Sequence, residues 1–347
     1  MSPMAEISVL DLAPIVQGGD AGGALRNSLD LARHAERLGF RRYWMAEHHN
    51  MPGIASAATA VALAYVGAGT SSIRIGAGGV MLPNHAPLVI AEQFGTLAAL
   101  YPDRIDLGLG RAPGTDAMTA RALRRHLAGG ADSFPQDVVE LLRFLEPAAP
   151  NQAVRAVPGS GADLDVWILG SSTFGAQLAA VLGLPYAFAS HFAPAEMMRA
   201  AAIYREQFQP SERLANPYLM FGLNVVAGET EADARYLFSS LQQAFVALRT
   251  GLPGPLPPPV EDMDERLDGA SRAMLGHALS QAIVGSPAIV QAKLAEFIDS
   301  TGANEVMVTS SIFDHGARLR SFEIVAQARD SLANALPVSG VLHTPVA

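Results

Sequence analysis

Short apolar runs alternate with amphipathic stretches along most of the chain. The first run, ISVLDL (7–12), precedes residues 24–39, where leucine and alanine recur at helical spacing until Gly39. Such spacing indicates one buried helix face, and a glycine after it indicates a C-terminal stop. Further strands are predicted at 41–47, 73–82, 104–110, 165–169, 186–190, 218–226 and 305–310, and further helices at 56–70, 87–100 and 135–146 among others.

The eight predicted strands lack the period-two alternation of a sheet with one wet face. Strands of this kind, each followed by a helix, indicate a parallel sheet that is buried on both faces. Eight such units close into a (β/α)8 TIM barrel with insertion loops at the C-terminal face of the strands. We predict this fold for residues 1–347 as a single domain, with an open doubly wound sheet as the alternative.

One segment interrupts this alternation. Residues 250–271, TGLPGPLPPPVEDMDERLDGAS, are rich in proline and then acidic, with no strand or helix period before Arg272. Long segments without regular structure in a compact domain are either disordered excursions or functional lids. We therefore expect either a disordered surface loop or a mobile lid over the barrel mouth.

Composition excludes several classes of function. The formal net charge is −9, whereas non-specific nucleic-acid binding needs a basic surface. The absence of cysteine excludes disulfides, thiolate metal sites and cysteine nucleophiles. No apolar run is long enough to cross a bilayer, and the N-terminal residues lack the basic start of a secretory signal. We therefore expect a soluble cytoplasmic protein that binds neither nucleic acid nor membranes.

An anion site is predicted at the end of the fifth strand. LGSSTFGAQLAAVLG (169–183) places Gly170, Ser171 and Ser172 between a strand and a helix. Free N–H groups and hydroxyls at a helix start can bind phosphate, although plain N-capping by either serine is the other interpretation. Arg111 ends the neighbouring strand and can reach the same phosphate. Its charge-assisted hydrogen bond contributes about 1.5–3 kcal/mol, against about 0.3–1 kcal/mol for a helix dipole.

Two glycine-rich stretches lie at other strand ends. DLGLGRAPG (106–114) has the first spacing of a dinucleotide fingerprint, but proline stands at the third glycine position. That motif also belongs after the first strand, so we exclude a Rossmann site. GAGG (76–79) is unusual, because glycine inside a strand is unfavourable without a reason. It indicates either a bend in the barrel or a flat ligand against bare backbone.

The stretch RRYWMAEHHN (41–50) places Glu47, His48 and His49 at the end of the second strand. Successive strand residues face opposite sides, so neighbouring histidines seldom bind one metal ion. The HExxH zinc pattern is missing and no second His/Asp/Glu cluster completes a site, so we predict no metal. A single inward histidine that acts as a general acid–base or hydrogen-bond donor is favoured over a structural pair.

These stretches together resemble the bacterial luciferase-like flavin monooxygenase family. The resemblance rests on YWMAEHHN (43–50), residues 73–116, VWILGSS (166–172) and FDHGARLRSFEI (313–324), in order along nearly the whole chain. It is closest to the uncharacterised luciferase-like oxidoreductases, and it implies a (β/α)8 barrel. It also implies reduced FMN at the barrel mouth and a match between residues 250–271 and the family's mobile loop.

The resemblance assigns roles to individual residues. His48 matches the active-site histidine of the family, and Gly78 and Gly79 match a non-prolyl cis peptide under the flavin ring. The phosphate-binding arginine and strand–helix turn of the family match Arg111, Gly170, Ser171 and Ser172. Ser190 and His191 occupy a strand end that faces the flavin in relatives, which makes His191 the second catalytic candidate.

The sequence also departs from luciferase itself. Gly110 replaces a reactive cysteine near the flavin and Ser171 replaces a glutamate, so we expect neither light emission nor oxidation of long-chain aldehydes. The resemblance implies a homodimeric monooxygenase that uses O2 and reduced FMN, supplied by a separate flavin reductase, on a small organic substrate. A deazaflavin-dependent hydride-transfer enzyme and a non-catalytic flavin-binding protein are the alternatives.

Overall fold

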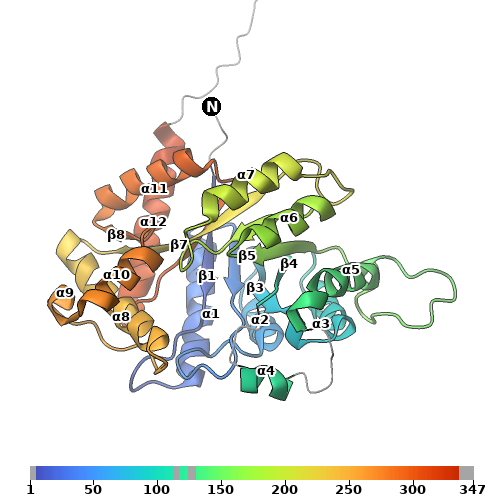
Figure 1. Ribbon diagram of the computed structural model, residues 1–347, viewed down its shortest axis with the longest axis horizontal. Helices are drawn as coiled ribbons and strands as arrows, with labels where there is room; N and C mark the ends of the chain where they lie inside the picture. Colours follow the sequence, from blue (N-terminus) through green and yellow to red (C-terminus); the bar gives the residue numbers. More distant parts are fainter. Residues whose placement is uncertain (1–4, 113–116, 124–129, 336–347) are drawn as a thin grey trace, which may run out of the picture.

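Eight parallel strands pair in a closed ring, and helices cover its outside (Figure 1). The computed structural model describes residues 5–112, 117–123 and 130–335. The ring strands are β1 (Glu6–Asp11), β2 (Arg42–Met45), β3 (Arg74–Met81), β4 (Ile105–Gly110), β5 (Asp165–Gly170), β6 (Tyr186–Phe188), β7 (Leu219–Ala227) and β9 (Glu305–Thr309). They follow one another in chain order, and β9 closes the ring between β7 and β1. The predicted (β/α)8 barrel is therefore confirmed, and the eight predicted strands are the strands that form it.

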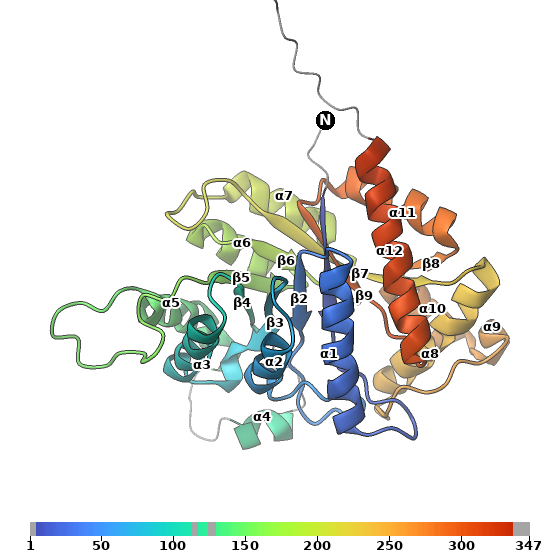
Figure 2. The ribbon, with the colours of Figure 1, turned by 180° about the vertical axis from the view of Figure 1, so that it is seen from behind.

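The helices that surround the ring are α1 (Ala21–Arg37), α2 (Thr59–Ala68), η1 (Leu82–Asn84), α3 (Pro87–Leu100), α4 (Ala117–Leu123), η2 (Gly130–Ser133), α5 (Phe134–Leu145), α6 (Thr173–Leu182), α7 (Met197–Gln207), α8 (Glu231–Arg249), α9 (Met263–Arg266), α10 (Gly269–Ala278), α11 (Pro287–Thr301) and α12 (His315–Ala335). The four helices predicted with bounds, at 24–39, 56–70, 87–100 and 135–146, agree with α1, α2, α3 and α5 to within three residues. The helix predicted at 24–39 begins earlier, because the Asp20 carboxylate caps it by accepting from the Gly23 N–H at 2.6 Å. The last helix, α12, packs beside α1, as Figure 2 shows.

The inside of the barrel is filled at its N-terminal end. Arg42 at the start of β2 pairs with Asp106 at 2.7 Å and with Glu305 at 3.1 Å, and all three side chains are buried. In the next layer Trp44 and Trp167 pack edge to face, with ring centroids 5.2 Å apart. Because ions and aromatic rings fill this end, a ligand has to enter from the C-terminal ends of the strands.

The region after α8 differs from the prediction. The expectation that residues 250–271 hold no helix before Arg272 is wrong, because α9 and α10 begin at Met263 and Gly269. The Asp268 carboxylate starts α10 by accepting from the Ser271 N–H at 2.6 Å. A short strand that was not predicted, β8 (Ile283–Gly285), pairs with the end of β7 outside the ring.

The segment 250–271 lies at the C-terminal end of the barrel. Leu256 forms an isolated parallel bridge with Val16, in the loop that follows β1. In Figure 1 the helices α8, α9 and α10 form one group at the left of the view. None of the described helices is long and apolar enough to cross a bilayer.

Candidate active site

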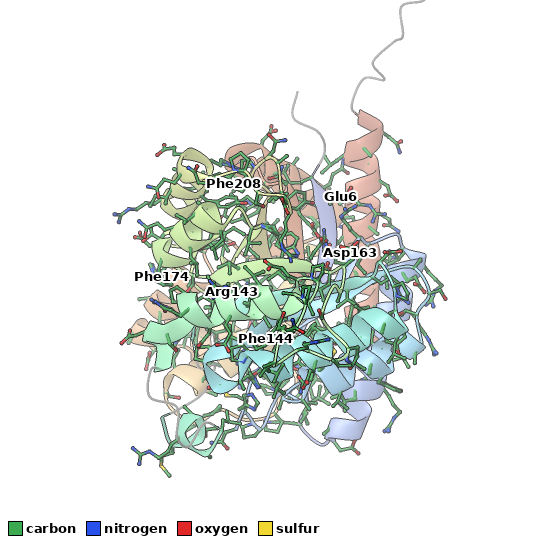
Figure 3. All side chains as sticks on the ribbon, turned by 90° about the vertical axis from the view of Figure 1, so that its right-hand side faces the viewer. Glu6, Arg143, Phe144, Asp163, Phe174 and Phe208 are labelled. Atoms are coloured by element: carbon green, nitrogen blue, oxygen red, sulfur yellow. The ribbon has the colours of Figure 1, made fainter. Side chains whose placement is uncertain are left out.

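Arg111 and the turn before α6 lie side by side at the barrel mouth. Gly110, the last residue of β4, pairs in register with Leu169 of β5, so the residues that follow both strands emerge together. The Arg111 guanidinium carbon lies 4.1 Å from the centroid of the Phe174 ring, a cation–π contact. Phe174, labelled in Figure 3, is the second residue of α6. The structure therefore brings together the arginine and the serine-bearing turn that the sequence singles out.

The start of α6 lacks a side-chain cap among the described residues. Ser172 is the N-cap residue, with extended backbone angles (φ −146°, ψ 170°), but its side chain makes no capping hydrogen bond. The Tyr186 hydroxyl donates to the Ser172 carbonyl at 3.0 Å and thereby fixes the turn. Simple N-capping is therefore not the role of Ser172 in this structure. The first-turn N–H groups of α6, with Arg111 beside them, form a site suited to a phosphate.

The Gly78–Gly79 peptide bond in β3 is cis. The register of β3 against β4 shifts at the same place. A Cβ atom on Gly78 would lie 2.9 Å from Leu10 and 3.1 Å from Trp44, and one on Gly79 would lie 2.7 Å from the Gly108 carbonyl oxygen. Close packing of the barrel wall therefore requires glycine at position 79, where a Cβ atom would meet backbone, and the register shift shows that the strand is irregular there, as the bend interpretation of GAGG expects.

His191 projects from the end of β6 against the bare backbone of β7. A Cβ atom on Gly222 would lie 2.3 Å from His191 Nδ1, so only glycine leaves room for the ring. The preceding Ser190 hydroxyl donates to the Gly222 carbonyl at 2.6 Å. Part of His191 reaches the surface, but its Nδ1 is buried and has no hydrogen-bond partner among the described residues.

His191 is a neutral imidazole at neutral pH. Burial, followed by the positive charge of a protonated His48, lowers the pKa of His191 to about 4. This electrostatic effect also means that the two predicted catalytic histidines, from β2 and β6, lie within range of each other. A neutral imidazole beside a second imidazole, with part of its side chain at the surface, is suited to contact a polar ligand.

Glu47 accepts hydrogen bonds from two imidazoles. His49 Nε2 and His85 Nε2 lie 2.7 Å and 2.8 Å from Glu47 Oε1. Burial raises the pKa of Glu47, but hydrogen bonds and charge from His85 and His49 outweigh it, so the pKa ends below its ordinary value of 4.5. From the sequence we expect no second His, Asp or Glu cluster to complete a site, and His85, which the connection between η1 and α3 brings against Glu47, is not foreseen.

The side chains of Glu47, His49 and His85 lie close enough together to be considered as a metal site. Their potential ligand atoms all lie within 4.8 Å of one another. Ligands about 2.0–2.2 Å from a tetrahedral zinc ion stand roughly 3.3 Å apart, however, whereas charge-assisted N–H···O bonds span about 2.7–2.9 Å. The observed separations are 2.7 and 2.8 Å, which is the hydrogen-bonding arrangement.

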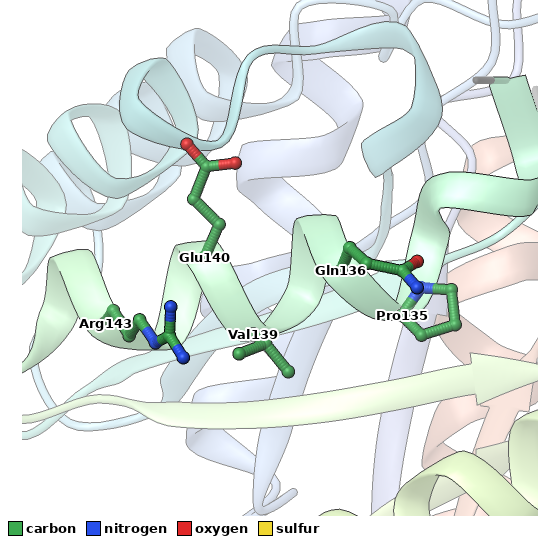
Figure 4. A pocket seen from close by; sticks show the side chains of 5 residues that line it. All are labelled: Pro135, Gln136, Val139, Glu140 and Arg143. Atoms are coloured by element: carbon green, nitrogen blue, oxygen red, sulfur yellow. The ribbon is translucent and has the colours of Figure 1, made fainter.

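A cavity of about 320 Å³ opens beside Ser171. Phe192 lines it from the segment after β6, and Arg249 and His277 line it from α8 and α10. The sequence does not point to Arg249 or His277, because both occupy ordinary helix positions far along the chain. A larger hollow of about 490 Å³ lies on the outside of α5 and is lined by that helix alone (Figure 4), so we place no chemistry there.

The sequence matches the family model described as luciferase-like monooxygenase over residues 5–305. A luciferase-like monooxygenase of Escherichia coli (strain K12) is 54% identical over 325 residues, which cover 94% of this chain and 97% of the relative. The crystal structure of apo-MsnO8 is 34% identical with a TM-score of 0.84, and the match covers 94% of this chain and 98% of that one.

Two solved structures of lower identity share the fold. One is the oxygenating constituent of 3,6-diketocamphane monooxygenase from Pseudomonas putida in complex with FMN, 17% identical with a TM-score of 0.70, with 94% of this chain and 97% of that one covered. The other is an F420-dependent secondary alcohol dehydrogenase in complex with an F420–acetone adduct, 15% identical with a TM-score of 0.69, with 94% and 99% covered. On the strength of the family match and its close relatives, the chain belongs to the luciferase-like monooxygenases, which are flavin-dependent oxidoreductases.

Proposed function

We propose that this enzyme is an FMN-dependent monooxygenase that uses O2 to oxygenate a small organic substrate, with reduced FMN supplied by a separate flavin reductase. The observation that carries the proposal is the pairing of Arg111 with the uncapped start of α6. A monophosphate such as that of FMN fits a guanidinium beside free helix N–H groups. The camphane monooxygenase of the same fold binds FMN, which supports the choice of cofactor.

The proposal assigns a part of the site to each region of FMN. Its phosphate is held by the guanidinium of Arg111 and by the turn at Gly170, Ser171 and Ser172. Its ring system borders Gly78 and Gly79, which form part of the barrel wall at Trp44. When bound, reduced flavin supplies the reaction with oxygen, and the protein orients the reactants and excludes water.

The two histidines and Ser190 form the opposite part of the site. His191, neutral at neutral pH, has its Nδ1 packed against Gly222, so it meets the cofactor or substrate through the part of its side chain that reaches the surface. His48 acts as a hydrogen-bond donor or general acid–base across from it. The Ser190 hydroxyl already donates to the Gly222 carbonyl, so it can only accept a hydrogen bond from the ligand.

Residues 250–271 and the apolar helices suggest two further features. We propose that this segment acts as a lid, since α10, which begins within it, lines the cavity at Ser171.

We also propose a homodimer through α2 and α3, where Val61 and Val89 are 72% and 43% exposed. Light scattering should show a dimer that Val61→Glu dissociates and that Val181→Glu, an equally apolar exposed site on α6, leaves intact.

Calorimetric titration with oxidised FMN, followed by oxygen uptake with reduced FMN and an added reductase, tests the proposal. We expect FMN to bind more tightly than riboflavin, and oxygen uptake to couple to oxygenation in a substrate screen. Hydride transfer with a deazaflavin coenzyme and no oxygen uptake would instead favour the reaction class of the F420-dependent dehydrogenase. Bound reduced flavin that decays without any coupled product would indicate a flavin-binding protein.

A further inference from the structure

The carboxylate of Glu47 connects two segments that border the proposed flavin site. Its Oε1 accepts from His49, two residues along the same strand end, and from His85 in the connection before α3. Its Oε2 accepts from the backbone N–H of Met81, the last residue of β3, at 3.3 Å. One buried side chain therefore ties the end of β2 to the end of the strand that carries the Gly78–Gly79 peptide.

His48 lies inside this connection. Trp44 and Ala46 pack in the barrel interior, whereas Tyr43 and Met45 pack among the surrounding helices. Beyond the strand, the electrostatic effect of His48 on His191 puts His48 within range of the mouth, while Glu47 bonds to His85 and Met81. Because Glu47 and His49 are joined through their side chains, the residue between them is held from both sides.

The hydrogen bonds of Glu47 continue the connection between the ends of β2 and β3 beyond the last paired residue of β2. The strand β2 ends at Met45, so positions 47–49 lie beyond its ladder. The Ser56 hydroxyl donates to the Ala46 carbonyl at 2.5 Å, just before these positions. The carboxylate of Glu47, which is only 2% exposed, then connects this segment to the end of β3 and to His85.

We propose that Glu47 is a positioning residue that, through the imidazoles of His49 and His85, fixes the His48 side chain against the β3 strand end. The proposal deepens the proposed function, because it rests on His48 as the group that meets the reactants. Displacement of a catalytic group by about 1 Å can reduce the rate by roughly 100-fold without weakening binding. The loss of the link should therefore reduce kcat and leave KM and flavin affinity nearly unchanged.

The test compares Glu47→Gln with Asp30→Asn. Both substitutions remove the charge of a carboxylate that pairs with an imidazole, but Asp30 meets His315 at 2.9 Å on the outside of the barrel. We expect Glu47→Gln to reduce kcat by about 10- to 100-fold with KM and the FMN dissociation constant within about threefold. Asp30→Asn should match the wild type, and thermal unfolding verifies that both variants are folded.

A second measurement needs no turnover. With 15N-labelled histidine, the imidazole signals of the nine histidines can be followed in each variant, and His48→Gln assigns the signal of His48. We expect the His48 signal to move in Glu47→Gln and in His85→Gln, and to stay in place in Asp30→Asn. The double variant Glu47→Gln/His85→Gln should lose no more activity than Glu47→Gln alone, because both act through one link.

Each outcome bears on the proposal. Unchanged kcat together with an unmoved His48 signal in folded Glu47→Gln would overturn it. Loss of wild-type activity on dialysis against a chelator, restored by a divalent metal ion, would also overturn it by showing that Glu47, His49 and His85 bind metal. If wild-type protein binds no flavin, the proposed function fails, but the movement of the His48 signal still decides whether Glu47 positions His48.

Discussion

The buried imidazole of His191 makes the stability of the protein depend on pH, and one substitution isolates the effect. Burial and His48 lower the pKa of His191 to about 4 from its ordinary value of 6.5. Between these two values the unfolded chain binds a proton at this position and the folded chain does not. The free energy of unfolding therefore falls as the pH falls through this window. The contribution of the neutral His191 to stability is fully present above pH 6.5. We predict that His191→Gln removes this contribution.

The size of the effect follows from the two pKa values. A tenfold difference in proton affinity corresponds to about 1.4 kcal/mol, so relative to pH 8 the wild type should lose about 2 kcal/mol at pH 5 and about 3 kcal/mol at pH 4 through His191. Because part of His191 reaches the surface, these figures are upper values. A loss of this size is a large share of the stability of a typical domain.

Urea unfolding between pH 4 and pH 8 measures the effect. The fluorescence of Trp44 and Trp167, the two tryptophans of the chain, reports on the barrel interior. The measured quantity is the difference in free energy of unfolding between wild type and His191→Gln at each pH, because the other groups titrate in both proteins. His315→Gln, which removes a partly exposed imidazole paired with Asp30, is the matched control. A wild-type-minus-variant difference that stays constant across this range would refute the reasoning.

Three further predictions concern other parts of the barrel. Arg111→Ala should weaken FMN binding by roughly 10- to 150-fold and riboflavin binding little, since a charge-assisted hydrogen bond contributes about 1.5–3 kcal/mol. Arg143→Ala on α5 is the control, and an equal loss of affinity for both ligands would exclude a phosphate contact. His48→Ala should keep FMN affinity within a few-fold and lose most turnover, so unchanged turnover would remove His48 from the mechanism. Asp106→Ala should reduce the free energy of unfolding by about 3–5 kcal/mol, because it removes one of the buried carboxylates that pair with Arg42. Asp165→Ala, at the exposed edge of the same group, should reduce it by under about 1 kcal/mol. Urea melts measure both variants.

The features that the sequence predicts well are local in the chain. The helix α3 runs from Pro87 to Leu100 as predicted, because a proline fits the first helical turn and the apolar spacing continues to the end. The meeting of Arg111 with the Ser171–Ser172 turn is not local, but it is predictable from strand order. Parallel strands that are neighbours in the ring deliver the residues after them to the same edge, so strand order alone places the two together.

The features that the sequence misses depend on contacts between distant residues. His85 reaches Glu47 across 38 positions, and only the η1 turn between β3 and α3 brings it there. Three residues are too few for β8 to show a period, and its pairing with β7 appears only in the folded chain. Proline and acidic residues obscure the start of α10, although Asp268 is a good N-cap in retrospect.

The two ends of the barrel differ in how their charged groups are paired. At the N-terminal end Arg42, Asp106 and Glu305 pair with one another, with Arg42 also 5.0 Å from the centre of the Trp167 ring. At the C-terminal end the Arg111 guanidinium rests on the Phe174 ring, beside a first turn of α6 that has no side-chain cap. Unpartnered buried atoms alone do not separate the two ends, because Trp167 Nε1 lacks a hydrogen-bond partner among the described residues as His191 Nδ1 does. The available cation and the free helix N–H groups are therefore what favours a ligand at the mouth between β4, β5 and β6, with the Glu47 link proposed as its border on the β2 and β3 side.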